Sequence, residues 1–406
     1  MDHLIYRSAG ESHGPQLTGI LEGLPAGMQI DFPRLDAELA ERQKGFGRGG
    51  RMKVESDRCE ITAGVRHGVT LGSPIAFTIF NKDWENWQSV MSVTSERAEP
   101  ASEREAAMTL PRTVPRPGHA DLAGAQKRGF ADLRNVLERS SARETAVRVA
   151  AAALAKMFLH ELGIETAAHV VRIGAAALSA PVPTVDEIRL RVRDSDVRCI
   201  DPETSEAMRS EIRAAAASGD TVGGIVEIVA TGVPPGLGDY IQWDKRLDAR
   251  LAGAVMSVPS VKGVEIGEGF AQAAHRGSDV HDEIFRDRDS GHPRTGGYYR
   301  TTNRAGGIEG GVTNGADVVV RAAAKPIPTL NHPLRSVDIH TGEESRAFVE
   351  RSDICSVPAV AVVCEAMVAL TLADACLEMF GGGTLGDIRE RFRLYIGRLK
   401  RFETGL

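Results

Sequence analysis

The chain has 406 residues and carries 49 Lys and Arg against 55 Asp and Glu, a formal net charge of −6 at pH 7. A mildly acidic chain lacks the basic footprint of a general nucleic-acid binder, which excludes that class but is compatible with a local basic site for a small anion. Its length suffices for about two to three domains and a large core.

The sequence carries no membrane or secretion signal that we recognise. The first residues, MDHLIYRSAG, show no basic segment followed by an apolar run, so we predict no signal peptide. The most apolar stretch, residues 359–380, contains Glu365, Asp374 and Glu378, which argues against a membrane span. The five cysteines include no CxxC pair, which predicts reduced thiols in a cytoplasmic protein without a zinc site or a disulfide framework.

Regular elements are predicted along the whole chain. Short runs rich in β-branched residues predict strands at residues 69–80 and 222–229. Periodicity, capping residues and Pro or Gly at the ends predict helices at residues 34–44, 142–162, 203–219, 358–380 and 387–402. The helix at residues 358–380 is apolar nearly all round, so we expect it to be buried between layers.

The sequence repeats itself once. RLDAELA at residues 34–40 recurs as RLDARLA at residues 246–252, and ERS at residues 138–140 recurs at residues 350–352. Two further pairs keep the same order, namely GLPAG at residues 23–27 with GVPPG at residues 232–236, and GVTLG at residues 68–72 with GVTNG at residues 311–315. These matches predict an internal duplication.

The duplication does not predict two separate domains, because no Pro- or Ser-rich linker separates the halves. We predict a single compact domain over residues 1–406, with pseudo-symmetric halves of about residues 1–205 and 206–406. Two long buried central helices covered by sheets predict an α+β fold, in the form of a layered sandwich.

Two glycine-rich motifs point to functions that their context argues against. GESHG at residues 10–14 matches the nucleophile elbow of serine hydrolases, but only nine residues precede it, too few for the sheet that the elbow needs. GFGRGG at residues 45–50 matches a dinucleotide fingerprint, but the predicted helix precedes the glycines instead of following them. We interpret the first as a turn after a strand.

Cations gather on the second of these loops. Five cations fall within a span of twelve residues on this Gly-rich loop, namely Arg42, Lys44, Arg48, Arg51 and Lys53. A solvated basic loop is one interpretation, and a lid over a polyanion is the other.

Further candidates lie in Pro- and Ser-rich segments. His119 lies between Arg116 and Asp121 in a loop stiffened by proline, which favours a general acid over a structural histidine. Ser141 is a helix cap, and the same helix start offers Arg139 and Arg143 to an anion. Together these residues suit a small substrate with phosphate and carboxylate groups, and no metal site is predicted.

The motifs taken together resemble those of chorismate synthase. They are GESHG at 10–14, GRGGRM at 47–52, RPGHAD at 116–121, RSSARET at 139–145, VKGVEIGEGF at 261–270, NRAGGIEGG at 303–311, KPIPT at 325–329 and RSD at 351–353. The resemblance implies a β-α-β sandwich and a homotetramer. It also implies conversion of 5-enolpyruvylshikimate 3-phosphate to chorismate by anti-1,4-elimination of phosphate, which requires reduced FMN without net redox change.

The resemblance also implies roles for individual residues. The implied catalytic residues are His13, His119 and Asp353. The implied substrate-binding residues are Ser12, Arg42, Arg48, Arg51, Arg116, Ser141, Arg143 and Arg351. The implied FMN-binding residues are Arg139, Ser140, Ser141, Pro259, Ser260, Gly310, Lys325, Pro326, Ile327, Pro328, Thr329 and Arg351, with Arg42 and Arg48 implied for NADP.

The implied mechanism assigns a proton-transfer role to each catalytic residue. His119 protonates the leaving phosphate or the flavin, His13 keeps the reduced flavin in its working protonation state, and Asp353 helps to take up the substrate proton through the flavin. Because no reductase domain is visible, we expect a separate flavin reductase, with NADPH as an indirect reductant. We expect residues 286–299 to form a mobile loop near the site.

Two other classes compete with this interpretation. One is another flavin or nucleotide enzyme that acts on a phosphorylated acid, and the other is a non-catalytic anion-binding or assembly protein built from the duplicated sandwich. The serine hydrolase is a third, weaker alternative.

Overall fold

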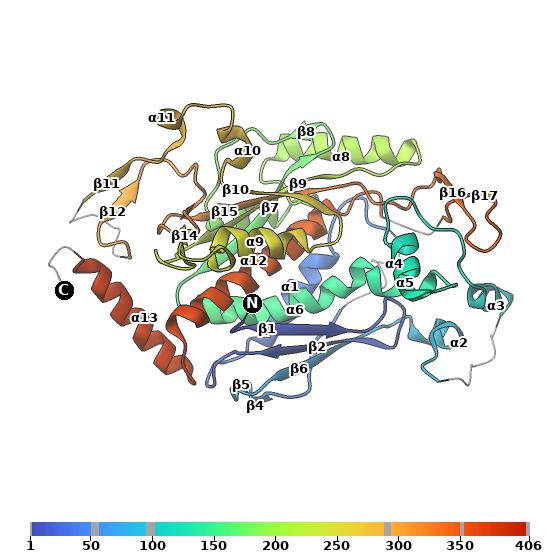
Figure 1. The fold of residues 1–406 in the computed structure, drawn as a ribbon, viewed down its shortest axis with the longest axis horizontal. Coiled ribbons are helices and arrows are strands. Elements are labelled where there is room, and N and C mark those ends of the chain that lie inside the picture. The colour runs from blue at the N-terminus through green and yellow to red at the C-terminus, as the bar shows by residue number, and fades with distance from the viewer. Residues whose placement is uncertain (1, 50–56, 95–101, 288–293, 350–352, 403–406) are drawn as a thin grey trace.

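The computed structural model describes residues 2–49, 57–94, 102–287, 294–349 and 353–402 (Figure 1). Within these ranges the chain mixes helices with antiparallel strands, which confirms the predicted α+β class. Besides the two long central helices described below, the helices are α1 Phe32–Gln43, α2 Gln88–Met91, α3 Glu103–Thr109, α4 Asp121–Arg128, α5 Arg134–Ser140, α7 Val185–Val192, α8 Pro202–Ala217, α9 Leu247–Met256, α10 Gly269–Gln272, α11 Gly277–Val280 and α13 Leu385–Lys400.

The first sheet has the strand order β1-β2-β6-β3 and is antiparallel throughout. Its strands are β1 Ile5–Ala9, β2 Gln16–Glu22, β6 Ile75–Phe80 and β3 Glu60–Ile61. Alternate residues of β6 are buried, which turns Ile75, Phe77 and Ile79 toward the core and leaves the other face more open to solvent.

The second sheet has the order β10-β15-β9-β7-β8 and is also antiparallel. Its strands are β10 Val261–Ile266, β15 Val318–Ala324, β9 Gly224–Thr231, β7 Glu165–Ile173 and β8 Ala176–Ala177. The remaining short strands form hairpins, namely β4 Val65–Arg66 with β5 Val69–Thr70, β11 Ile284–Arg286 with β12 Tyr298–Arg300, β13 Ile308–Glu309 with β14 Val312–Thr313, and β16 Arg335–Val337 with β17 Glu344–Arg346.

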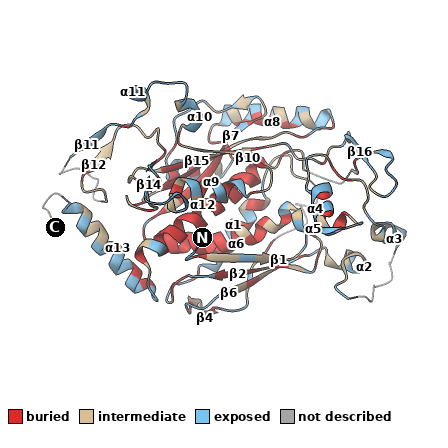
Figure 2. Cartoon of the chain, in the orientation of Figure 1, coloured by how far each residue is buried: buried red, intermediate tan, exposed pale blue. Residues whose placement is uncertain are grey.

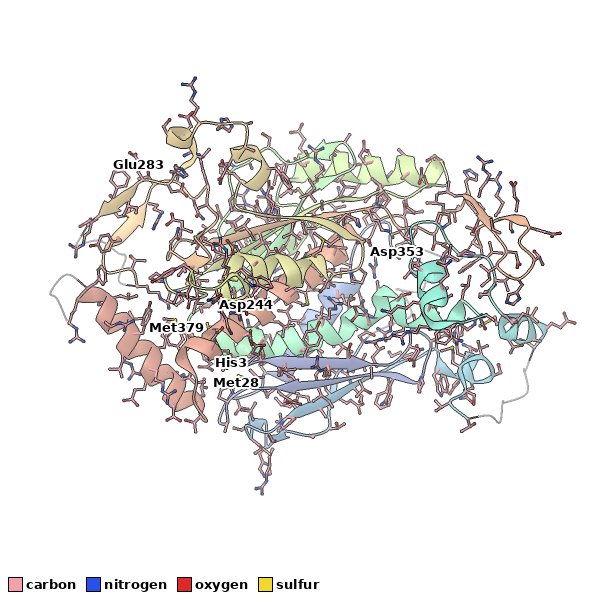
Figure 3. The ribbon with its side chains drawn as sticks, viewed as in Figure 1. His3, Met28, Asp244, Glu283, Asp353 and Met379 are labelled. Atoms are coloured by element: carbon pink, nitrogen blue, oxygen red, sulfur yellow. The ribbon has the colours of Figure 1, made fainter. Side chains whose placement is uncertain are left out.

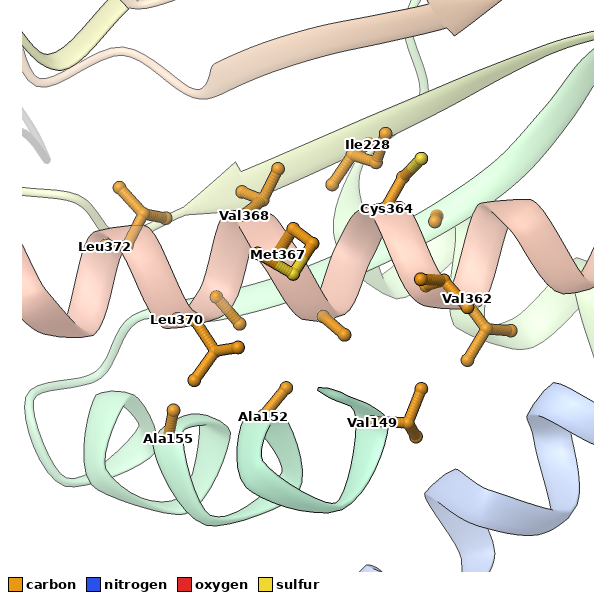
Figure 4. Packing of buried hydrophobic residues seen from close by; sticks show 14 of the residues in the cluster. Val149, Ala152, Ala155, Ile228, Val362, Cys364, Met367, Val368, Leu370 and Leu372 are labelled. Atoms are coloured by element: carbon orange, nitrogen blue, oxygen red, sulfur yellow. The ribbon is translucent and has the colours of Figure 1, made fainter. Parts of the chain in front are cut away.

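Two long helices, α6 Thr145–Glu161 and α12 Val357–Phe380, lie between the sheets (Figure 1). Helix α6 packs on β2, and α12 packs on α6, β7 and β9. Ala152 and Ala155 of α6 face α12, and their small side chains let the two helices approach closely (Figure 4). Both helices are buried over most of their length, whereas α13 exposes one face (Figure 2).

Helix α12 is long and apolar enough to span a membrane by length and composition, but every residue of its most apolar stretch is buried inside the protein. It is therefore a core helix, in agreement with its predicted burial. Each of the five predicted helices is present within a few residues of its predicted bounds.

The predicted strand at residues 69–80 is wrong as a single element. The chain instead forms β5 and then β6, separated by a turn in which Gly72 has a φ of 79° and Pro74 follows. A positive φ and a proline without an N–H group both interrupt strand pairing, so the run divides in two.

An ionic cluster around the buried Lys156 joins three helices. The Nζ atom of Lys156 lies 2.6 Å from Oε1 of Glu365 on α12 and 2.8 Å from Oε2 of Glu38 on α1. Burial lowers the pKa of Lys156, but the two carboxylates outweigh burial and leave that pKa above its ordinary value. Nothing in the local sequence indicates this cluster, because its members are far apart in the chain.

Candidate active site

A cavity of about 450 Å³ lies where α6 and α12 begin, between the two sheets. Its walls come from the turn after β1, the segment after α1, the loop before α4, the α5–α6 junction, the turns before β10 and after β15, and the start of α12. The predicted residues that line it are Ser12, His13, Arg42, Arg48, Arg116, His119, Ser140, Ser141, Arg143, Pro259, Ser260, Lys325, Ile327, Pro328, Thr329 and Asp353.

Three predicted residues do not line this cavity. The guanidinium of Arg139 instead donates hydrogen bonds to the backbone carbonyls of Ser8 and Gly10, at 3.0 Å each. Gly310 lies in the turn between β13 and β14, and Pro326 is absent from the lining although its neighbours belong to it. Arg51 and Arg351 lie outside the described residues.

Two buried arginines at the cavity share one carboxylate. Asp57 accepts hydrogen bonds from Arg42 at 2.8 Å and from Arg143 at 2.7 Å. Burial raises the pKa of Asp57, but the two guanidinium charges outweigh burial and hold that pKa below its usual value. The Nε atoms of both arginines are buried and, among the described residues, have no hydrogen-bond partner. Two cations on one carboxylate leave positive charge for an anion in the cavity.

The glycine-rich loop after α1 is held against the start of α12. Asp353 accepts a hydrogen bond from the backbone N–H of Gly49 at 2.6 Å and pairs with Arg48 at 3.1 Å. The backbone N–H of Ile354 donates to the carbonyl of Gly47 at 2.8 Å. Asp353 lies in the half of the molecule away from α13 (Figure 3), and it lines the cavity together with Arg48 and Gly49 of this loop.

His119 is paired with a fully buried carboxylate. Its Nδ1 atom lies 2.6 Å from Oδ1 of Asp121, the first residue of α4, and Oδ2 of Asp121 accepts from Nε of Arg116 at 2.9 Å. Burial raises the pKa of Asp121, but hydrogen bonds from His119 and Arg116 outweigh burial and hold that pKa far below its usual value. Nδ1 of His119 is thus engaged by Asp121, and its Nε2 atom lies 3.3 Å from Nη2 of Arg116, which also lines the cavity.

The loop that carries His119 packs closely on the KPIPT segment. Gly118 has a φ of 80°, and its carbonyl accepts a hydrogen bond from Nζ of Lys325. Arg116 donates to the hydroxyl of Thr329 at 3.1 Å. A Cβ atom on Gly118 would lie 3.5 Å from Pro328, which is an ordinary contact distance. Glycine is therefore needed here mainly because the backbone is left-handed.

His13, the second candidate histidine, lies in the turn between β1 and β2. Its ring stacks on that of Trp87 with centroids 3.6 Å apart, and its Nδ1 atom lies 2.9 Å from Oε2 of Glu138. The hydroxyl of Ser141 donates to that of Ser12 at 3.2 Å, which joins this turn to the start of the α5–α6 junction. Because β1 returns directly as the antiparallel β2, Ser12 does not occupy a nucleophile elbow.

Ser260 has an unusual backbone conformation beside the cavity. Its φ is 75°, and its carbonyl accepts a hydrogen bond from the N–H of Lys325 at 3.0 Å. Its buried hydroxyl has no hydrogen-bond partner among the described residues, as expected for a group that meets a ligand. No group of three His, Cys, Asp or Glu residues suited to a metal is found in the described ranges.

Sequence reasoning missed the side chains that hold the predicted ones in place. Asp57, Trp87 and Glu138 were not among the candidates, although Glu138 belongs to the repeated ERS motif. Asp121 was noted only as a neighbour of His119. We expect a mobile loop near the site at residues 286–299, but the described residues of this segment belong to the β11–β12 hairpin and do not line the cavity.

Comparisons with known proteins agree with the motif resemblance. Residues 4–377 match the family model described as chorismate synthase. The chain is 53% identical over 404 residues to a chorismate synthase of Desulforudis audaxviator, which covers 99% of this chain and 100% of that protein. It is 54% identical over 392 residues to one of Moorella thermoacetica, covering 97% and 98%. A solved structure described as a crystal structure of chorismate synthase matches with a TM-score of 0.78 and 38% identity, covering 99% of this chain and 100% of that one.

Proposed function

We propose that the cavity described above is the active site of this chain, which belongs to the chorismate synthase family. The chain is a lyase that converts 5-enolpyruvylshikimate 3-phosphate to chorismate and phosphate by anti-1,4-elimination, the last common step of the shikimate pathway to aromatic amino acids. One C–O bond, to the phosphate, and one C–H bond break, and the ring gains one C=C bond, without net oxidation or reduction.

The observation that carries this assignment is the set of cations around one small cavity. Arg42, Arg48, Arg116, Arg143 and Lys325 line it together with His13 and His119. A substrate with one phosphate and two carboxylates matches such a set. Positive groups fixed in place beforehand stabilise the charge that grows on the departing phosphate.

The proton that the leaving phosphate needs comes, in our proposal, from His119. Asp121 engages its Nδ1 atom, so we propose that Nε2, which lies 3.3 Å from Nη2 of Arg116, is the nitrogen that meets the leaving phosphate. The same buried carboxylate stabilises the protonated ring, which must be charged before it donates. Arg48 and Arg143 hold the phosphate while the proton moves.

The cavity also fits reduced FMN. The buried hydroxyl of Ser260 offers a hydrogen bond, Lys325 offers a charge, and Val258, Val360 and Val363 offer an apolar wall to a flavin ring. When bound, a reduced flavin supplies electron density to the substrate as phosphate departs. We propose Ser140, Ser141 and the 325–329 segment as further contacts, and Arg42 and Arg48 as the place where NADP would bind.

The test is an anaerobic assay with 5-enolpyruvylshikimate 3-phosphate and photoreduced FMN, following chorismate and phosphate release. We expect turnover only with reduced flavin, and a parallel reaction with NADPH in place of light decides whether the chain reduces its own cofactor. His119→Ala lowers kcat by about 100-fold or more, whereas His275→Ala, which does not line the cavity, keeps wild-type rates. Bound FMN without chorismate formation would overturn the assignment.

We also propose that the chain is a cytoplasmic homotetramer supplied by a separate flavin reductase. Family membership supports the tetramer, and sedimentation equilibrium tests it directly. A reductase partner is supported if the NADPH reaction gives no chorismate while photoreduced FMN does.

Finally, we propose a single domain built as a β-α-β sandwich of two pseudo-symmetric halves. The orders β1-β2-β6-β3 and β7-β9-β15-β10 support it, because each matches the other strand for strand. So does a repeated hydrogen bond, from the Thr70 hydroxyl to the carbonyl of Pro25 at 2.6 Å and from the Thr313 hydroxyl to that of Pro234 at 2.7 Å. This pairing favours a boundary between α6 and β7, earlier than the predicted one near residue 205.

A further inference from the structure

We propose that Glu138 and Trp87 are positioning residues that fix the ring of His13, with its Nδ1 atom on the carboxylate and its Nε2 atom toward the cavity. The inference rests on the proposed function, since it concerns a histidine of the same site. It adds two residues that lie behind the cavity wall, because neither Glu138 nor Trp87 is part of the lining.

Glu138 holds the turn between β1 and β2 by three separate contacts. Its carboxylate accepts a hydrogen bond from the backbone N–H of His13 at 2.9 Å and lies 2.9 Å from Nδ1 of the same residue. Its backbone carbonyl accepts from the N–H of Ser12 at 3.0 Å. One residue of α5 therefore sets the position of two residues of the turn, and its carboxylate is almost completely buried.

Trp87 restricts the plane of the same ring. The two rings are nearly parallel, with an angle of 17° and centroids 3.6 Å apart. The indole is itself held by a hydrogen bond from its Nε1 atom to Asp83 at 2.9 Å, and the guanidinium of Arg134 lies over its ring at 5.7 Å. Arg134 also lies 3.7 Å from the Glu138 carboxylate, so both supports of His13 share one cation.

These contacts determine which ring nitrogen serves the cavity. A carboxylate only accepts hydrogen bonds, so Nδ1 of His13 must carry a proton to satisfy it. A stacked indole prevents the ring from rotating about its Cβ–Cγ bond, which would exchange the two nitrogens' surroundings. His13 lines the cavity, and with Nδ1 on the carboxylate the proposal assigns Nε2 to the cavity side of the ring.

The first test is spectroscopic and needs neither substrate nor flavin. In protein with ¹⁵N-labelled histidine, assigned with His13→Asn, Nδ1 of His13 is expected to show the shift of a protonated nitrogen. Glu138→Gln presents an amide that also donates, so we expect the Nδ1-protonated population to fall. Trp87→Leu keeps the carboxylate but removes the stacked face, so we expect broadened His13 signals. Unchanged His13 signals in both variants would overturn the proposal.

The second test separates positioning from a merely structural role. An amide in place of the carboxylate that fixes a histidine tautomer can lower kcat by up to about 10⁴-fold, so Glu138→Gln should lower kcat by at least about 10-fold with KM for the phosphorylated substrate changed little. Glu138→Asp should recover part of the rate. Glu144→Gln is the matched control, because Glu144 pairs with Arg148 at 2.8 Å and does not line the cavity.

The two tests also distinguish failure of this inference from failure of the proposed function. If the wild-type chain forms no chorismate, the histidine spectra still decide whether Glu138 and Trp87 hold His13. If Glu138→Gln does not fold, the His13 signals of Trp87→Leu test the same proposal. A Glu138→Gln enzyme with wild-type kcat and wild-type Nδ1 signals would refute the positioning role.

Discussion

The Nδ1 atom of His119 lies 2.6 Å from Oδ1 of Asp121, whose side chain is completely buried. The other oxygen of that carboxylate accepts from Arg116, so Asp121 orients a ring nitrogen and a guanidinium of the same cavity at once. His119 and Asp121 are two residues apart in sequence. Their contact depends on α4 beginning at Asp121, which turns the carboxylate back toward the loop.

Asp121→Asn is expected to lower kcat by at least about 10-fold and by up to about 10⁴-fold, because the amide neither fixes the tautomer of His119 nor stabilises its charged ring. KM should change less, since Arg48 and Arg143 still bind the phosphate. Steady-state kinetics under anaerobic conditions measure both. Asp338→Asn is the control, since Asp338 accepts from Thr113 at 2.6 Å and does not line the cavity; equal rates in the two variants would contradict the role.

The same pair predicts how stability depends on pH. The pKa of Asp121 is lower in the folded state than the value of about 3.9 expected for the unfolded chain, despite burial, because His119 and Arg116 favour the charged form. A lowered folded-state pKa stabilises the protein above the unfolded value, and this contribution is lost as pH falls below about 4. Denaturant unfolding should give a larger free energy of unfolding for wild type than for Asp121→Asn at pH 6. This difference in unfolding free energy should shrink below pH 4.

Arg143→Lys is expected to weaken substrate binding. A lysine keeps the charge but cannot contact both Asp57 and a phosphate in the same fork geometry. Loss of one charge-assisted hydrogen bond of about 1.5–3 kcal/mol corresponds to a KM raised by about 10- to 100-fold. Arg148→Lys, whose partner Glu144 is outside the cavity lining, should leave KM unchanged.

Gly118→Ala is expected to destabilise the His119 loop by about 1–3 kcal/mol, because an alanine at a φ of 80° is strained. Activity should fall with it, since the Gly118 carbonyl also receives the Lys325 ammonium. Gly253→Ala is the opposite case. Gly253 lies within α9 with nothing near its missing Cβ, so alanine should stabilise by up to about 1 kcal/mol. Chemical denaturation compares the two.

Lys156→Met is expected to cost about 3–5 kcal/mol of folding free energy, because it leaves the buried carboxylate of Glu365, and the partly exposed one of Glu38, without their cation. The exposed pair of Lys44 and Glu41 provides the comparison, and Lys44→Met should change stability by less than about 1 kcal/mol. A Lys156→Met chain as stable as Lys44→Met would show that the central cluster does not hold the helices together.

Local sequence signals predicted the helices well and the strands less well. Helix α12 is apolar on all sides and α8 is followed by Gly219, so both were evident from residue type and spacing. The run at residues 69–80 has strand composition throughout, yet the turn at Gly72 divides it. The hairpin strands of only two or three residues leave no periodicity to detect.

By itself, the sequence determined the α+β class, the long helices and the motifs that identify the family, because these depend on residue type and short-range order along the chain. Only the tertiary structure decided which charged side chains pair with each other. Asp57 reaches Arg143, Glu138 reaches His13 and Glu365 reaches Lys156 across long stretches of chain. Such pairs form when packing of α6, α12 and the sheets brings distant backbone segments together, and burial then makes each unpaired charge too costly to keep.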